Sequence, residues 1–244
     1  MSPPQVTKTV HKRRWRRMTG VAAVLLIVAL AVTCFSVYRA SKHVPQFYEH
    51  ALSADPVVQR TAGDELERRA LDLHNEVKRS GNWEALFTEE QINGWLAVDL
   101  VEKFPKLLPA NVQEPRMAIT ADEVQVACRY QTERIDTVIS LAVSISLAEE
   151  PNVVAVRVKR ARAGALPIPL NQFLDDITAA AQKSDLDVRW LQTEGDPVAL
   201  IRMPTENMNL PDRTLLLEKF ELRQGEAFLA GRTEWKNASA GVAE

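Results

Sequence analysis

Residues 18–38 form a stretch of 21 residues without a charged side chain. A helix of that length spans about 31 Å, close to the hydrocarbon thickness of a bilayer. Ten of its residues are Val, Leu, Ile or Phe, and together they favour membrane insertion by about 3–6 kcal/mol. Because the stretch is apolar all round and directly follows a basic cluster, it predicts a transmembrane anchor rather than a buried helix of a soluble core.

Charges on either side of this stretch predict its orientation. Two basic residues follow it closely, Arg39 and Lys42, and six precede it: Lys8, Lys12, Arg13, Arg14, Arg16 and Arg17. The positive-inside rule then places residues 1–17 in the cytoplasm as a basic arm that also touches anionic lipid. The main domain is expected outside the cell membrane, on the periplasmic or extracellular side.

Two other fates of this stretch are weighed against an uncleaved signal-anchor. A cleaved signal peptide needs small residues before the cleavage site, and Tyr38-Arg39-Ala40 places a bulky Tyr there. Lipidation of Cys34 needs a lipobox, and Ala31-Val32-Thr33 lacks the usual Leu and Gly or Ala. The sequence therefore favours the uncleaved single-pass anchor, with cleavage and lipidation as alternatives.

The rest of the chain has the composition of a globular domain. Apolar residues make up 46% and charged residues 25% of the whole chain, which excludes disorder for most of it. Residues 48–244 hold 22 basic and 32 acidic residues, a net charge of −10, which argues against nucleic acid as a partner. Cys34 and Cys128 cannot pair within one chain in this topology, so the core alone must hold the domain.

Residues 39–82 are expected to form a juxtamembrane connector and an amphipathic helix. Asp55-Pro56 is typical of a helix start, and Ser80-Gly81-Asn82 follows the expected end near Arg79. The helix packs either on its own domain or on a partner, including a second copy of the chain. Its apolar stripe contains Val58, Ala62, Leu66, Ala70, Leu73 and Val77.

Residues 83–236 are expected to form one extracytoplasmic α+β domain. Thr88-Glu89-Glu90-Gln91 predicts a capping box that opens a helix over Glu89–Phe104. The stretch from Pro105 to Pro115 predicts a loop. A second helix is expected over residues 170–184, and residues 237–244 are expected to fray.

Alternating apolar residues predict the strands of this domain. Three strands near residues 124–131, 135–147 and 153–159 are joined by connections too short for parallel crossovers, so the sheet should be antiparallel. The middle strand would span roughly 43 Å, which suggests a long, curved meander. Later strands are expected at 187–192, 198–203, 215–223 and 227–235.

The order of elements resembles a known group of proteins. An N-terminal anchor precedes Leu86-Phe87-Thr88-Glu89-Glu90-Gln91-Ile92-Asn93, and Leu166-Pro167-Ile168-Pro169-Leu170 interrupts the long meander. This order resembles the YpmS-like bacterial envelope proteins, which are single-pass proteins with an extracytoplasmic domain. It also resembles the elongated lipid carriers of the tubular lipid-binding type. The resemblance covers about residues 18–235 as pattern alone; it implies an envelope protein with an apolar groove and transfers no functional residue.

Motifs for catalysis, metal binding or cofactor binding are missing from this sequence. The four His residues lie outside the expected sheet, and no HExxH, CxxC, G-x-S-x-G, Walker A or G-x-G-x-x-G motif occurs. Neighbouring carboxylates such as Glu89-Glu90 point about 100° apart on a helix and do not converge on one substrate atom. We therefore expect no catalytic residue, no metal and no cofactor.

The first functional hypothesis is binding of a lipid or another apolar ligand in a groove between helices and sheet. Candidate lining residues are Trp95, Phe104, Phe173, Ile177 and Trp190. The basic run from Arg157 to Arg162 is a second feature. Regular alternation would place Arg157 and Lys159 on one face and Arg160 and Arg162 on the other, which favours a solvated strand end over a contact of these four residues with an anionic headgroup.

The alternative hypothesis is an envelope scaffold or accessory protein that binds a partner protein without a small ligand. The partner would contact the 55–79 helix or a free sheet edge. This hypothesis predicts that Leu66, Leu73 and Val77 are exposed. Whether the interface between helices and sheet is filled or hollow discriminates between the two.

Overall fold

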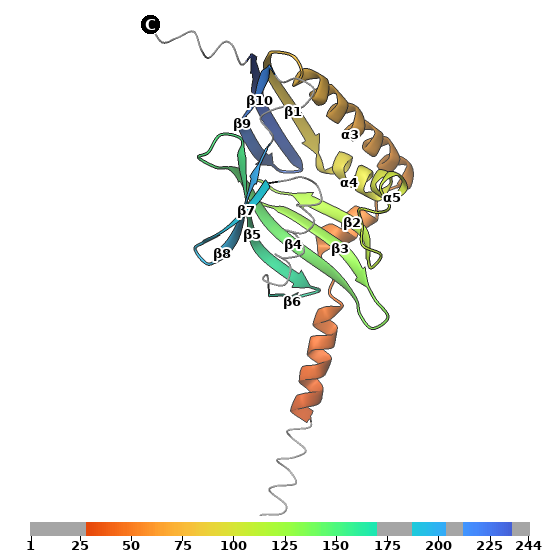
Figure 1. The fold of residues 1–244 in the computed structure, drawn as a ribbon. Helices are drawn as coiled ribbons and strands as arrows, with labels where there is room; N and C mark the ends of the chain where they lie inside the picture. The colour runs from red at the N-terminus through yellow and green to blue at the C-terminus, as the bar shows by residue number, and fades with distance from the viewer. Residues whose placement is uncertain (1–27, 170–186, 204–211, 236–244) are drawn as a thin grey trace, which may run out of the picture.

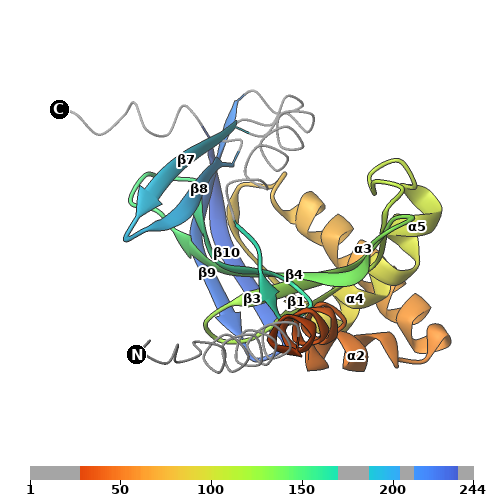
Figure 2. The same cartoon turned by 90° about the horizontal axis from the view of Figure 1, so that it is seen from below.

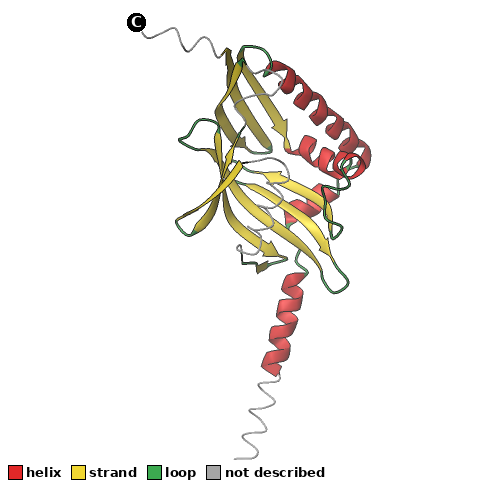
Figure 3. Ribbon diagram, viewed as in Figure 1, coloured by secondary structure: helices red, strands yellow, loops and turns green. Residues whose placement is uncertain are grey.

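The computed structural model describes residues 28–169, 187–203 and 212–235. Four predicted segments lie outside these ranges: the basic arm 1–17, residues 18–27 of the expected anchor, the helix expected at 170–184, and the tail 237–244. Within the described residues the fold is α+β, as the sequence predicts, with helices beside antiparallel sheets (Figure 3).

A helix projects from one end of the body. Residues 28–41 are helical and point away from the end that carries strands β1 (Gly81–Thr88), β9 (Arg213–Arg223) and β10 (Glu226–Trp235) (Figure 1). The chain then turns into α2 (Gln46–Leu52), which lies next to the projecting helix when that helix is seen end-on (Figure 2). Among the described residues, no helix is both long and apolar enough to cross a membrane.

The two predicted helix starts are confirmed by their capping contacts. α3 (Pro56–Glu76) begins at Asp55, whose carboxylate accepts a hydrogen bond from the Val57 backbone N–H at 2.7 Å. α4 (Glu89–Ala97) begins at the Thr88–Gln91 capping box, in which each residue's side chain accepts from the other's backbone N–H. Such caps satisfy backbone donors that have no partner within the helix.

α3 and α4 cross at a pair of glycines, Gly63 and Gly94. A Cβ atom on Gly94 would lie only 2.3 Å from the carbonyl oxygen of Gln59, so no larger residue fits without separating the helices. The single helix expected over Glu89–Phe104 is wrong, because α4 ends at Ala97 and Val98 (φ −114°, ψ −65°) forms a turn. A separate α5 (Asp99–Lys103) follows.

A three-stranded antiparallel sheet contains both the first and the last strand of the body. Its order is β1 (Gly81–Thr88), β10 (Glu226–Trp235), β9 (Arg213–Arg223). The Trp83 ring is buried against Gly231, where a Cβ atom would meet the ring at 2.3 Å. β1 is absent from the sequence-based prediction, and β9 and β10 were expected in the long sheet.

A seven-stranded antiparallel sheet forms the larger part of the body. Its strands are β2 (Val112–Ile119), β3 (Val124–Gln131), β4 (Asp136–Leu147), β5 (Val153–Ala163), β6 (Leu166–Pro167), β7 (Asp187–Thr193) and β8 (Asp196–Arg202). The order is β2-β3-β4-β5-β8-β7, with β6 paired to β5. The loop expected up to Pro115 is wrong at its end, because β2 begins at Val112 and the register shifts between Gln113 and Arg116.

Polar contacts join the two sheets. Asn152 is 2% exposed and has a left-handed backbone (φ 58°). Its side chain donates to the carbonyl oxygen of Leu215 and accepts from the N–H of Leu217 on β9, both at 2.6 Å. Further along, the Gly225 N–H donates to the carbonyl oxygen of Ile119 at 2.9 Å. The sheets are therefore hydrogen-bonded to each other at two separate places.

Candidate functional site

One face of the seven-stranded sheet is lined by apolar side chains. Cross-strand partners in an antiparallel sheet point to the same face. One apolar row crosses four strands through Trp190, Ala199, Val156 and Ile145. A second row crosses four strands through Val158, Val143, Val124 and Ile119. We call this surface the apolar face.

The apolar face is only partly covered. Val124, Val143 and Val158 form a buried cluster. Around them lie side chains that are only half-buried, namely Met117, Val126, Leu141, Ile145, Val156, Trp190 and Leu222. Leu222 belongs to β9, so the three-stranded sheet contributes to the same surface. Half-buried apolar side chains on this face leave surface that a ligand can cover.

The predicted lining residues do not form one group. Trp95 and Phe104 contact each other, with ring centroids 5.9 Å apart and planes at 42°. They belong to α4 and the end of α5, and α4 packs beside β2 at one edge of the sheet. Trp190 lies on β7 at the other edge and packs against the buried valines. Phe173 and Ile177 lie outside the described residues.

The opposite face of the sheet is basic, because β5 contains a bulge. Val158 pairs with Val143, but the next partner, Ala142, pairs with Arg160, so Lys159 is an extra residue. In the strand register, Arg157 lies opposite Ser144 and Arg162 lies opposite Ser140. Both serines are on the same face as Ala142. The expected split of the basic run is therefore wrong. The three arginines share one face.

A small pocket lies on this basic face beside the projecting helix. We call it the junction pocket; its volume is ≈ 160 Å³. Its polar lining is His43, Gln125, Ser140, Arg160 and Arg162, and its remaining lining is Pro45, Phe47, Leu141, Ala142 and Gly164. None of these residues is acidic. A carboxylate outside the lining, that of Glu123, pairs with Arg160 at 2.5 Å.

Other members of the basic run have partners as well. Arg157 pairs with Glu194 at 2.8 Å, and Lys159 donates to the carbonyl oxygen of Asp122 at 3.4 Å. Within the described ranges, Arg162 forms no ion pair. The bulge was missed at the sequence level, but a signal exists: the apolar positions run 154, 156, 158 and then 161, 163, which is a shift of one residue.

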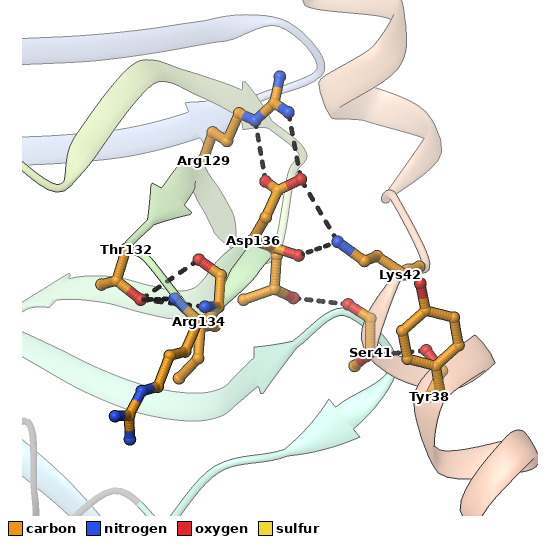
Figure 4. A network of polar contacts seen from close by, with 9 residues as sticks. Tyr38, Ser41, Lys42, Arg129, Thr132, Arg134 and Asp136 are labelled. Atoms are coloured by element: carbon orange, nitrogen blue, oxygen red, sulfur yellow. Dashed lines mark hydrogen bonds and ion pairs between the residues drawn. The ribbon is translucent and has the colours of Figure 1, made fainter.

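A set of polar contacts fixes the end of the projecting helix to the start of β4 (Figure 4). The Lys42 Nζ donates to the backbone carbonyl oxygen of Asp136 at 2.6 Å and pairs with its carboxylate at 3.3 Å. Arg129 binds the same carboxylate through two nitrogens, at 3.0 and 3.3 Å. The Thr137 hydroxyl donates to the carbonyl oxygen of Ser41 at 2.6 Å. We call these contacts the clasp.

The turn after β5 holds the helix from a second direction. The Ala165 N–H donates to the carbonyl oxygen of Ala40 at 2.8 Å. Gly164 has φ 60°, and a Cβ there would lie 2.4 Å from the same oxygen. Both the backbone angle and the close approach therefore require glycine at this position. The helix end is thus bonded to two parts of the sheet.

One pKa value reflects the clasp, and a second reflects the packing of α2 on the sheet. Hydrogen bonds from Arg129 and then Lys42 hold the pKa of Asp136 below its ordinary value. Burial, followed by the charge of Glu114, raises the pKa of Tyr48 to about 12. Tyr48 packs against Ala127 and Val138 on the basic face, so α2 covers part of that face.

Neither a metal-binding cluster among the described residues nor a related protein assigns a function to these features. Across the described part of the chain, no group of three or more His, Cys, Asp or Glu side chains is placed to hold a metal ion. Cys34 and Cys128 are free thiols, and burial raises the pKa of Cys128. Comparison with protein families, with curated proteins and with solved structures finds no match.

Proposed function

We propose that this protein is a single-pass, membrane-anchored extracytoplasmic protein that binds a lipid or another apolar ligand against its apolar face. The observation that carries the proposal is the half-buried apolar lining around the Val124 cluster. A sheet face built for packing alone would bury such side chains more fully. Ligand sites of this kind are apolar and concave, with few polar groups.

Exposure of the projecting helix supports the anchor. Within residues 28–41 the large apolar side chains stand open, with Phe35 64% and Leu30 61% exposed. A helix with apolar side chains all round is stable in lipid rather than in water. Residues 18–27, which complete the uncharged stretch, carry Val21, Val24, Leu25, Leu26 and Ile27. The six basic residues before the stretch then favour a cytoplasmic N-terminus.

The scaffold alternative has less support from the described residues. It needs Leu66, Leu73 and Val77 as an exposed stripe, and all three are half-buried. α3 packs along α4 and against β1. These three residues therefore pack on their own domain, and we favour the apolar ligand.

The test uses the full chain in lipid nanodiscs that contain a phospholipid with a photoreactive acyl chain. After illumination, mass spectrometry of peptides locates the crosslinks. We expect crosslinks on the projecting helix and also on β4 and β5. Ile145→Asn, on the apolar face, should reduce those on the sheet at least fivefold. Leu191→Asn is the matched control, since Leu191 is 53% exposed and lies on the opposite face.

Protease treatment of intact cells tests the anchor separately. We expect the body to be digested and residues 1–17 to be protected. Crosslinks confined to the projecting helix would contradict ligand binding on the sheet. A chain that leaves the membrane fraction in carbonate would contradict the anchor.

A further inference from the structure

We propose that the junction pocket binds the phosphate of an anionic phospholipid headgroup in the membrane that holds the anchor. The inference rests on the proposed membrane anchoring and assigns a second lipid contact, on the opposite face of the sheet from the apolar face. Three observations carry the inference. They are the distance of the pocket from the end of the uncharged stretch, the positive charge of the pocket lining, and the hydrogen bonds that join the projecting helix to the sheet.

The position of the pocket matches the headgroup layer. Tyr38 ends the uncharged stretch and is exposed, as aromatic residues at a membrane interface are. His43, which lines the pocket, follows five residues later. The helix ends at Ser41, so three helical residues rise about 4.5 Å and the two residues that follow add up to about 7 Å, which places His43 roughly 5–11 Å beyond Tyr38. A headgroup layer is about 5–7 Å thick on each side of the hydrocarbon core, so this range includes it. The pocket therefore lies beside headgroups when Tyr38 lies at the boundary of the hydrocarbon core.

The lining of the pocket suits one small anion. Arg160 and Arg162 stand two residues apart on one face, with Ser140 paired to Arg162. Glu123 neutralises one of the two guanidinium groups, and Arg162 has no ion pair within the described ranges. Arginine, serine and amide donors bind phosphate oxygens well. Phe47 and Pro45 add an apolar wall for the glycerol end of a lipid.

The clasp holds the pocket at a fixed distance from Tyr38. Lys42 and Ser41 are bonded to β4, and Ala40 is bonded to the turn after β5. Because these contacts leave no loose linker between helix and sheet, the pocket cannot swing away from the bilayer. A polyanion in solution fits less well, since the pocket is ≈ 160 Å³ and residues 48–244 carry a charge of −10.

The experiment measures which lipids the full chain retains. The protein is placed in nanodiscs of equal parts phosphatidylglycerol and phosphatidylcholine, and native mass spectrometry counts the lipids that stay bound. We expect the wild type to retain phosphatidylglycerol preferentially. Each arginine near an anionic membrane surface contributes about 1 kcal/mol, so Arg162→Gln should lower the preference about fivefold and the double variant with Arg160→Gln about 25-fold.

Controls keep the result specific. Arg189→Gln removes the same charge from the same sheet face, but Arg189 is paired with Glu150 and does not line the pocket. It should change the preference less than twofold. Arg162→Gln breaks no ion pair within the described residues, so it should fold normally, which circular dichroism checks. Inorganic phosphate is the third arm, added to the chain in phosphatidylcholine nanodiscs.

Each outcome decides the inference. Equal retention of both lipids by a chain that is still anchored would overturn the pocket and leave the proposed function standing. Saturable binding of inorganic phosphate without lipid preference would assign the pocket to a free anion and also overturn it. If Arg189→Gln lost as much of the preference for phosphatidylglycerol as Arg162→Gln, the effect would come from overall charge, and the pocket would be overturned as the binding site. A chain that is not anchored at all would overturn both proposals.

Discussion

Asn152 offers the sharpest test of how the two sheets are joined. Its side chain forms two hydrogen bonds of 2.6 Å to the backbone of β9, and its own backbone has φ 58°. Asparagine tolerates this left-handed conformation better than other non-glycine residues. Asn152→Ala removes both hydrogen bonds and places a strained residue at the turn. Asn152→Gly removes the hydrogen bonds alone.

The expected cost follows from these contacts. Losing two buried hydrogen bonds, and leaving the Leu215 carbonyl and the Leu217 N–H without partners, costs about 2–4 kcal/mol. Left-handed strain in alanine adds about 1 kcal/mol. We therefore expect the free energy of unfolding to fall by about 3–5 kcal/mol in Asn152→Ala and by about 1 kcal/mol less in Asn152→Gly.

Thermal unfolding of the full chain in mild detergent, followed by near-UV circular dichroism, measures the change. A domain of this size loses about 2–4 °C per kcal/mol, so Asn152→Ala should lower Tm by about 6–20 °C. Asn82→Ala, at an exposed position on β1, is the matched control and should stay within about 0.5 kcal/mol of the wild type. The reasoning fails if Asn152→Ala behaves like this control, or if the glycine variant is the less stable of the two.

Three further changes test other contacts. Because the pKa of Tyr48 is raised to about 12, the stability that its neutral hydroxyl gives the fold is complete below pH 10 and is lost between pH 10 and 12. Tyr48→Phe should therefore make the free energy of unfolding depend less on pH in that range of an alkaline denaturation series. Gly94→Ala would gain about 0.5–1 kcal/mol in an ordinary helix, but here the Cβ meets Gln59 at 2.3 Å, so urea unfolding should show a loss of about 1–3 kcal/mol. The pKa of Asp136 is lowered, so the clasp is stabilised above about pH 4 and weakens as pH falls through that lowered pKa. Asp136→Asn should speed hydrogen exchange at residues 38–42 at pH 7 and remove the acid dependence.

Local signals predicted much of this fold. The alternation in β3, β4 and β5, the start of α3 at Asp55 and the capping box at Thr88 are all encoded within a few residues. What the sequence hides is pairing over long distances. β1 pairs with β10 almost 150 residues later, and nothing near Trp83 identifies that partner. The division into two sheets depends on this pairing and was therefore missed.

The candidate site was predicted less well, for similar reasons. Aromatic side chains indicate apolar surface but not which surfaces meet, so Trp95 and Trp190 were grouped although they lie at opposite edges of the sheet. The junction pocket depends on contacts between residues near 43, 125, 140 and 160, which no local pattern links. Only the shift of apolar positions in β5 could have revealed the shared face of its arginines.

That shift also explains how one strand serves two different surfaces. In a regular strand, Arg160 would stand opposite Leu141 and Arg162 opposite Ile139, on the apolar face. Burying two guanidinium groups there without partners would cost several kcal/mol. The extra residue Lys159 returns Ala161 and Ala163 to the apolar face and turns both arginines to the opposite face, where they line the junction pocket. A single inserted residue thus keeps the apolar face continuous along β5 and places the basic charge in the lining of the junction pocket.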